Sequence, residues 1–392
     1  MYRLLLLCTI CVMGMACKQK TNPDTHSKTD SEMIKQPEKI FIGTYTRDEG
    51  WVNGKGDGIY LASLADDGSS ITDAQIVAEL VNPTFLNLSP DRKNLYAVSE
   101  IGGGEPGSGL VVAYAIGDDA TLTEIGRYPT NAFSPCYVIV DATGKFVFVA
   151  NYQGGVAMVY RRNDDGSLDF VQELNHEGSG PHPNQNASHP HMTKISPDNN
   201  YLFVPDLGSD KIWSYRINHD AGTVSKTEQE FAQMAPGAGP RHMDFHPSKN
   251  LVYVINELNS TVSVMEYDPA LGALEEIQAI STLPDDFTDW NSSADIHVHP
   301  NGKFVYASNR GHNSIAAFSI DEDSGTLTSL GQVSTEGEFP RNFAIHPSGE
   351  FIYAANQNSD SITIFSINSE TGTFKFTGSS LEVSTPVNIT FY

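Results

Sequence analysis

Four residues in the second half of the chain carry side chains suited to proton transfer and anion binding: His191, Arg241, Glu257 and Arg310. Imidazole and carboxylate groups are common general acids and bases in proteins. Guanidinium groups bind anions through strong, charge-assisted hydrogen bonds. These four side chains predict a site that binds an anionic group and moves protons beside it, provided that the fold brings them together.

A repeated unit of short strands predicts how the fold does so. Six similar segments, each a strand, a turn and a second strand, recur at intervals of 47 to 55 residues, as in MDFHPSKNLVYVINE and IHVHPNGKFVYASNR. Two more short strands follow each pair, and SIAAFSI is an example of the first of these. Four antiparallel strands in a unit of this length are typical of one blade of a β-propeller.

The two ends of the repeat complete one another. Near the N-terminus, KIFIGTYT matches the second strand of a unit with no first strand before it. At the C-terminus, PVNITFY matches a first strand with nothing after it. Pairing the two makes a seventh blade and removes two exposed sheet edges. We therefore predict an all-β fold over residues 38–392, a seven-bladed β-propeller with four antiparallel strands per blade, closed by the C-terminal strand.

Two positions of the repeat reach the same mouth of the central channel, because the first and second strands of a blade run antiparallel. The position that opens the innermost strand holds Thr84, Cys136, His191, Arg241, Ala294, Arg341 and Val387. The position that ends the second strand holds Tyr45, Glu100, Tyr152, Leu207, Glu257, Arg310 and Gln357. Scaffold positions repeat their residue type, whereas these two vary and carry His, Arg and Glu. We therefore place the site at this mouth; the alternative is a rim of solvated charges.

The N-terminal sequence predicts export and membrane anchoring, and we do not expect it to form part of the folded domain. Residues 1–16 have a positive start and a short apolar stretch, which is typical of a signal peptide. The small residue before Cys17 matches a bacterial lipoprotein signal, so we expect lipidation at Cys17 and a flexible tether over 17–37. The protein would then be exported to the cell envelope or periplasm. The alternative is an ordinary secretory signal with a chance cysteine.

Net charge and cysteine count narrow the partners. With 48 acidic and 24 basic residues, the formal charge of −24 disfavours nucleic acid and anionic membrane surfaces as partners. An anion site must therefore be a local concentration of arginine. Beyond the N-terminal segment the chain contains only Cys136, so an internal disulfide and a cysteine metal site are both excluded there.

The back half of the chain resembles a known family in the stretches HPHMTKISPDNNYLFVPDLGSDKIWSY, GPRHMDFHPSKNLVYVINELNSTVSV, SSADIHVHPNGKFVYASNRGHNSIAAF and PRNFAIHPSGEFIYAANQNSDSITIF. They resemble the bacterial 6-phosphogluconolactonase of the seven-bladed type, whose family includes the fungal carboxy-cis,cis-muconate lactonizing enzyme. The resemblance implies hydrolysis of a small, anionic sugar lactone. It also implies a catalytic group of one His, two Arg and one Glu, which on matching positions are His191, Arg241, Glu257 and Arg310.

Lactone hydrolysis assigns expected roles to these side chains. Arg241 and Arg310 would hold the carbonyl oxygen and the anionic group of the substrate, where negative charge develops. Either Glu257 or His191 would act as the general base, and the other would protonate the leaving alkoxide. The remaining residues expected to bind substrate or shape the pocket are Arg341, Asn256, Asn309, Gln357, His189 and Glu100. Two points stay open: whether Arg341 is instead an ion-paired structural residue, and whether His182 or His189 shares or replaces the role of His191.

Other functions use the same residues. Lactone formation or cycloisomerisation needs the same groups. A non-enzymatic, envelope-tethered binding module would instead display exposed aromatic side chains around its rim. His297 and His299 alternate on one strand, but His299 shares its turn position with His246 and His346, which favours a structural hydrogen bond over a metal site. We expect no metal and no cofactor; the oligomeric state is open.

Overall fold

Residues 38–102 and 109–392 are described by a computed structural model. The expected signal peptide, Cys17 and the tether lie outside the described residues. Within them, the second strand of each blade is buried along almost its whole length because neighbouring blades cover both of its faces. This explains why these strands read as continuous apolar runs, as in β9 and β17.

The strands form seven four-stranded antiparallel sheets, which confirms the predicted seven-bladed β-propeller. The strands of each blade, from the channel outwards, are β28 (Pro386–Phe391), β1 (Lys39–Thr44), β2 (Ile59–Leu64) and β3 (Ile71–Ala78); β4 (Leu86–Leu88), β5 (Asn94–Ser99), β6 (Leu110–Ile116) and β7 (Leu122–Pro129); β8 (Pro135–Val140), β9 (Phe146–Asn151), β10 (Val156–Arg162) and β11 (Leu168–Asn175); β12 (Lys194–Ile195), β13 (Tyr201–Asp206), β14 (Lys211–Asn218) and β15 (Thr223–Gln233); β16 (Pro240–Phe245), β17 (Leu251–Asn256), β18 (Thr261–Asp268) and β19 (Ala273–Ser281); β20 (Ser292–Val298), β21 (Phe304–Arg310), β22 (Ser314–Ile320) and β23 (Leu327–Ser334); β24 (Pro340–Ile345), β25 (Phe351–Asn356), β26 (Ser361–Ile367) and β27 (Phe374–Glu382). A 3-10 turn, η1 (Gln357–Ser359), follows β25.

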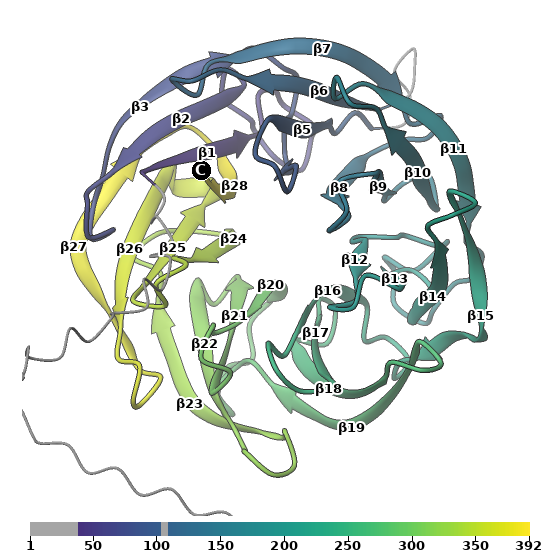
Figure 1. The fold of residues 1–392 in the computed structure, drawn as a ribbon. Helices are drawn as coiled ribbons and strands as arrows, with labels where there is room; N and C mark the ends of the chain where they lie inside the picture. Colours follow the sequence, from purple (N-terminus) through teal and green to yellow (C-terminus); the bar gives the residue numbers. More distant parts are fainter. Residues whose placement is uncertain (1–37, 103–108) are drawn as a thin grey trace, which may run out of the picture. The chain divides into compact units, whose positions relative to one another are not determined.

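The ring closes as the sequence predicted. Strand β28 pairs antiparallel with β1, with Phe41 opposite Thr390 and Ile42 opposite Ile389. Figure 1 shows the C-terminal strand β28 as the innermost strand of the blade that contains the N-terminal strands β1 to β3. The first and last segments of the propeller therefore share one sheet.

Hydrogen bonds between neighbouring blades repeat around the ring. The hydroxyls of Tyr96, Tyr253, Tyr306 and Tyr353, one in each of four second strands, donate to the carbonyl of an outer-turn glycine in the next blade. Side-chain oxygens of the innermost strands accept from backbone amides of the next innermost strand, as Asn342 does from Ile389 at 3.0 Å. These bonds fix the angle between blades and hence the positions at the channel mouth.

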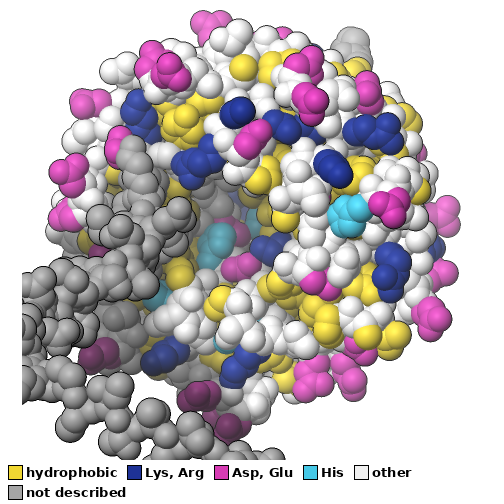
Figure 2. All heavy atoms as spheres, in the orientation of Figure 1, with side chains coloured by type: hydrophobic (Ala, Val, Ile, Leu, Met, Phe, Trp, Pro, Cys, Tyr) yellow, Lys and Arg dark blue, Asp and Glu magenta, His cyan; other side chains and the backbone are white. Residues whose placement is uncertain are grey.

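The centre of the propeller is hollow and polar. The face in Figure 2 has a depression at its middle, in which histidine, acidic and basic side chains lie. None of the helices in the described part of the chain is both long and apolar enough to cross a bilayer.

Candidate active site

Most innermost strands open with a β-bulge, which explains how the repeat delivers varied side chains to the mouth. The register shifts between Pro240 and His242, and again between Pro340 and Asn342. The extra residues are Arg241 and Arg341. Because a bulge leaves one residue unpaired and bends its strand, it directs a side chain away from the regular sheet faces.

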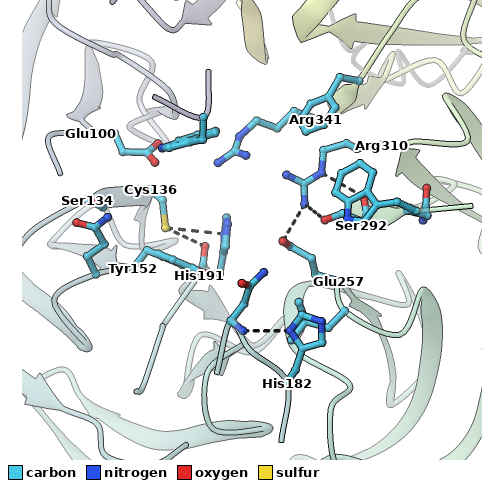
Figure 3. A pocket seen from close by; sticks show the side chains of 17 residues that line it. Glu100, Ser134, Cys136, Tyr152, His182, His191, Glu257, Ser292, Arg310 and Arg341 are labelled. Carbon is cyan, nitrogen blue, oxygen red and sulfur yellow. Dashed lines mark hydrogen bonds and ion pairs between the residues drawn. The ribbon is translucent and has the colours of Figure 1, made fainter. Parts of the chain in front are cut away.

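A cavity of about 780 Å³ lies at this mouth. The predicted residues that line it are His191, Glu257, Arg310, Arg341 and Glu100, together with His182. Figure 3 shows these side chains converging from different blades of the ring. The structure thus brings together the varied members of the two mouth positions.

Glu257 lies between two arginines. Its Oε2 is 2.8 Å from Nη2 of Arg310 and 2.9 Å from Nε of Arg241. Oε2 makes the closest contact in both ion pairs. The Glu257 side chain is 15% exposed and lines the cavity. The carboxylate is therefore held by two guanidinium groups while the side chain faces the space where a ligand would bind.

The charges around Glu257 keep it ionised. Burial alone would raise the pKa of Glu257, but Arg310, Arg241 and Arg341 outweigh burial and lower the pKa below its ordinary value. Arg310 is held in turn by Ser292, whose Oγ accepts a hydrogen bond from Nη2 at 2.7 Å. Near neutral pH Glu257 is therefore a carboxylate among three guanidinium groups, and the three arginines outnumber Glu257 and Glu100 within an acidic protein.

Arg341 is the cation of this group that forms no ion pair with a described acidic side chain. Its guanidinium lies over the rings of Tyr45 and Trp51, at 5.5 and 5.4 Å from their centroids. Among residues 38–102 and 109–392, no carboxylate lies within the 4.0 Å that defines a salt bridge to it. The alternative of an ion-paired structural role is therefore not supported, and Arg341 lines the cavity as an available anion site.

His191 is neutral in this environment. Burial, followed by Arg241, His242 and Arg341, holds its pKa well below the ordinary value for histidine. The backbone amide of His191 donates to the carbonyl of Pro205 at 2.9 Å, which anchors the residue at the start of its blade. A neutral imidazole that lines the cavity can donate or accept a hydrogen bond but carries no charge to attract an anion.

Arg241 lies below the main cavity rather than on its wall. Its side chain is 2% exposed, and Nη1 donates to the carbonyl of Ala294 at 2.6 Å. It borders a recess of about 10 Å³, the size of one water molecule, between itself and His191. Burial, with Arg310 and Arg341 nearby, lowers the pKa of Arg241 to about 9, so it is still cationic at neutral pH. Arg241 was expected to hold the substrate; the structure places it beside Glu257 and outside the wall of the main cavity.

Three further residues expected in the pocket lie outside the two cavities. Asn256 and Asn309 precede the cavity residues by one position, so they face the opposite side of the strand. Their amides bind within the sheets: Nδ2 of Asn256 donates to Ser263, and Oδ1 of Asn309 accepts from Ser293 at 2.8 Å. Gln357 is buried within the turn η1 and donates to Asn358.

Of two other residues expected to bind substrate, His189 lies outside the cavity wall and Glu100 lies on it. The ring nitrogens of His189 bind the carbonyl of Tyr152 at 2.9 Å and Oδ1 of Asn186 at 3.0 Å, and the ring stacks on Tyr152. It supports a cavity residue without lining the cavity. Glu100 lines the cavity, with Oε2 accepting hydrogen bonds from the hydroxyls of Tyr45 and Thr84.

Aromatic side chains at the rim were not predicted. Trp51 is 56% exposed and Trp290 is 65% exposed, and both line the cavity with Phe339. We expected exposed aromatic side chains at the rim only in a non-enzymatic binding module. Their presence here therefore does not distinguish an enzyme from such a module. Both tryptophans lie in loops between strands, where the repeat does not align the residues of different blades. The sequence signal that could have drawn attention to them is the rarity of tryptophan, since the chain has only three.

His297 and His299, which alternate along the chain, each pair with a nearby protein group. Nε2 of His299 pairs with the carbonyl of Gly349 at 2.7 Å, and His246 pairs likewise with Gly302. Nε2 of His297 lies 3.1 Å from the buried Asp295. In the part of the chain that the structure describes, no group of three or more His, Cys, Asp or Glu side chains is arranged to hold a metal ion.

Comparisons with known proteins agree along the whole propeller. A family model described as "Lactonase, 7-bladed beta-propeller" matches residues 39–391. A Bacillus subtilis (strain 168) protein named 6-phosphogluconolactonase is 39% identical over 305 residues, which cover 77% of this chain and 83% of that protein. A Formosa agariphila protein of the same name is 36% identical over 315 residues, covering 78% and 85%. The structure of a Pseudomonas aeruginosa periplasmic gluconolactonase matches with a TM-score of 0.84 and 32% identity, covering 90% of this chain and 98% of that one.

Proposed function

We propose, on the premise that this chain belongs to the seven-bladed β-propeller lactonase family, that it hydrolyses a sugar lactone. The observation that carries the proposal is the arrangement of Glu257 beside Arg310 in a cavity that Arg341 also lines. An ionised carboxylate, a donor for a developing oxyanion and a separate cation are the groups that hydrolysis of an anionic lactone needs.

The geometry supports Glu257 as the general base. A water molecule attacks the lactone carbonyl carbon and gives a proton to the carboxylate of Glu257, which the two ion pairs hold in place. The Arg310 guanidinium donates hydrogen bonds to the carbonyl oxygen as it becomes an oxyanion. When the tetrahedral intermediate collapses, the ring C–O bond breaks and the alkoxide takes the proton from Glu257.

His191 then has a different role from that of a proton source. Because its pKa lies well below the ordinary value, it is unprotonated near neutral pH and is a poor general acid. As a neutral imidazole lining the cavity, it donates a hydrogen bond to the ring oxygen that leaves. This stabilises negative charge on that oxygen before the proton arrives.

Arg341 would bind the anionic end of the substrate. Two relatives are named 6-phosphogluconolactonase, and the solved neighbour is named a gluconolactonase. The phosphate of a phosphorylated lactone would form an ion pair with the guanidinium of Arg341. With a plain lactone bound, this guanidinium would be hydrated instead. We propose that the protein accepts both and prefers the phosphorylated one.

Initial rates with a panel of lactones test this function. Purified protein is mixed with 6-phosphogluconolactone, glucono-δ-lactone and a γ-lactone, and acid release is followed with a pH indicator above the spontaneous rate. We expect turnover of at least one sugar lactone, with or without a chelator, because no metal takes part in the proposed step. No acceleration of any sugar lactone would reject hydrolysis and favour the envelope binding module, for which the exposed rim tryptophans are the supporting observation.

We further propose that the protein is exported and held at the envelope by a lipid on Cys17. The apolar stretch that precedes Cys17 in the sequence supports this proposal. The solved gluconolactonase neighbour is named as periplasmic, which is compatible with export of this chain. An exported lactonase would act on lactones that arise outside the cytoplasm.

A further inference from the structure

One residue of the cavity breaks a rule of the repeat. Before the proline that opens an innermost strand, five blades place a residue with positive φ, between 45° and 66°: Asn82, Ser134, Gly239, Phe339 and Thr385. Such a backbone suits glycine and is tolerated by asparagine, but it strains a bulky side chain. Four of the five residues are small or polar, whereas Phe339 is neither. Phe339 is the one large apolar side chain among these five equivalent positions, and it is present despite the conformational cost.

The Phe339 ring forms part of a stack at the cavity wall. One face lies against Trp290, with ring centroids 6.2 Å apart and an interplanar angle of 12°. The guanidinium of Arg310 lies 5.2 Å from the Phe339 centroid. Two hydrogen bonds hold the backbone in place, from the Phe339 amide to Asn313 Oδ1 at 2.9 Å and from the Gln357 amide to the Phe339 carbonyl at 3.1 Å. The stack thus joins the reacting centre to the rim.

The outer end of the stack is exposed although it is held in a fixed orientation. Trp290 is 65% exposed yet its ring is parallel to Phe339. An ordered, exposed tryptophan beside a cavity is a surface for stacking a ring at low entropic cost. The hydroxyl of Ser134 and the side-chain amide of Asn184 also line the cavity, and neither has a hydrogen-bond partner among the described residues. Figure 3 shows Ser134 on the side of the cavity opposite Arg310 and Ser292.

The cavity exceeds the size of one sugar. Pockets of about 300–1,000 Å³ hold drug-sized ligands, which are larger than a monosaccharide lactone. The cavity holds about 780 Å³. A ring bound at Glu257 and Arg310 leaves room for a second ring beside the aromatic stack, with free hydrogen-bonding groups for its hydroxyls.

We propose that Phe339 and Trp290 form an outer subsite that stacks on a second sugar ring, so that the substrates include glycosylated aldonolactones such as disaccharide lactones. The apolar face of a pyranose stacks on Trp290, and its hydroxyls bind the polar groups at the cavity wall. The lactone ring remains at Glu257 and Arg310. This inference rests on the proposed lactonase function and extends it by naming the substrate class.

The ratio of specificity constants for two lactones tests the subsite. kcat/KM is measured for lactobiono-δ-lactone and glucono-δ-lactone with wild-type protein, Trp290→Ala, Phe339→Gly and Phe170→Ala. Phe339→Gly removes the ring and also relieves the strained backbone, so loss of folding does not obscure the result. We expect wild-type to favour the disaccharide lactone about tenfold, and each of the two subsite variants to lower that ratio about fivefold to tenfold. Phe170, an exposed aromatic on β11 outside the cavity, is the matched control and should leave the ratio as in wild-type.

Binding of the product acids separates the two levels of the proposal. Lactobionate and gluconate are titrated into wild-type protein by calorimetry, and lactobionate should bind about tenfold more tightly. Turnover of gluconolactone without a preference for the disaccharide would overturn the subsite alone. If neither lactone is hydrolysed, the lactonase proposal fails, and equal binding of the two acids would then overturn the subsite as well.

Discussion

At the scale of single residues, the site depends on how burial and charge compete. Burial lowers the pKa of His191, and neighbouring cations lower it further, so both effects favour the neutral form. For Glu257 the two effects oppose each other, and the three arginines prevail. One buried proton-transfer group is therefore charged and the other neutral across the physiological pH range.

The pH profile of wild-type protein tests these states. Glu257 must be ionised to act as the base, and its lowered pKa means that activity is lost only as pH falls through that pKa, below about 4.3. The pKa of His191 lies well below its ordinary value, so titration of this imidazole does not control activity near neutral pH. We therefore expect kcat for glucono-δ-lactone to stay level from about pH 5 to about pH 8, after subtraction of spontaneous hydrolysis. A half-maximal point between about pH 6 and about pH 7 would show that a histidine of ordinary pKa controls the reaction.

The sequence identified all four charged residues that line the cavity, because a repeat exposes the positions that depart from its rule. Glu257, Arg310, Arg341 and Glu100 were found in this way, as was His191. Ser292, Trp290 and Phe339 were missed, since they lie in or beside connections between blades where the repeat has no register. Asn256 and Asn309 belong to a position that is Asn in four blades, which favours a structural role, and they lie outside the two cavities because adjacent residues of a strand face opposite sides.

At the scale of elements, closure of the ring is the feature on which the rest depends. The fold could be read from the sequence because the two incomplete ends match two halves of one blade. The repeat did not reveal the bulges that open the innermost strands, because a bulge changes strand pairing without changing the spacing of the turns. These bulges nevertheless direct Arg241 and Arg341 out of the sheets.

The tyrosine bonds between blades provide a test of closure. Tyr353→Phe removes the hydroxyl that donates to Gly68 across the closing interface, and Tyr253→Phe removes the equivalent bond to Gly325. Phenylalanine fits this position, since Phe41 and Phe148 occupy it in other blades. We expect each change to lower the free energy of unfolding by about 1 kcal/mol, measured in urea at neutral pH. A loss for Tyr253→Phe but none for Tyr353→Phe would contradict the described closure.

At the scale of the whole molecule, an acidic propeller surrounds a small cationic site. The formal charge of −24 opposes the approach of anions at long range. At the channel mouth, Arg241, Arg310 and Arg341 outnumber Glu100 and Glu257 and so reverse this sign locally. The substrate class is therefore selected by the cavity rather than by the surface field.

Cell fractionation tests the proposed location. With intact Cys17 the protein should sediment with membranes and dissolve in detergent, because a lipidated cysteine anchors the chain. Cys17→Ser should shift the protein out of the membrane fraction without changing its specific activity, since residue 17 lies outside the propeller. Equal sedimentation of the two forms would argue against the anchor.

The turnover of glucono-δ-lactone by Glu257→Gln tests the central claim most directly. The amide keeps the shape of the carboxylate but cannot accept the proton of water, so we predict that kcat falls about 100-fold or more. Gln357→Leu, at the equivalent position of another blade and outside the cavity, should retain wild-type kcat. Thermal unfolding of all three proteins shows that each is folded. Wild-type turnover by a folded Glu257→Gln protein would contradict the assignment of hydrolysis to this mouth of the propeller.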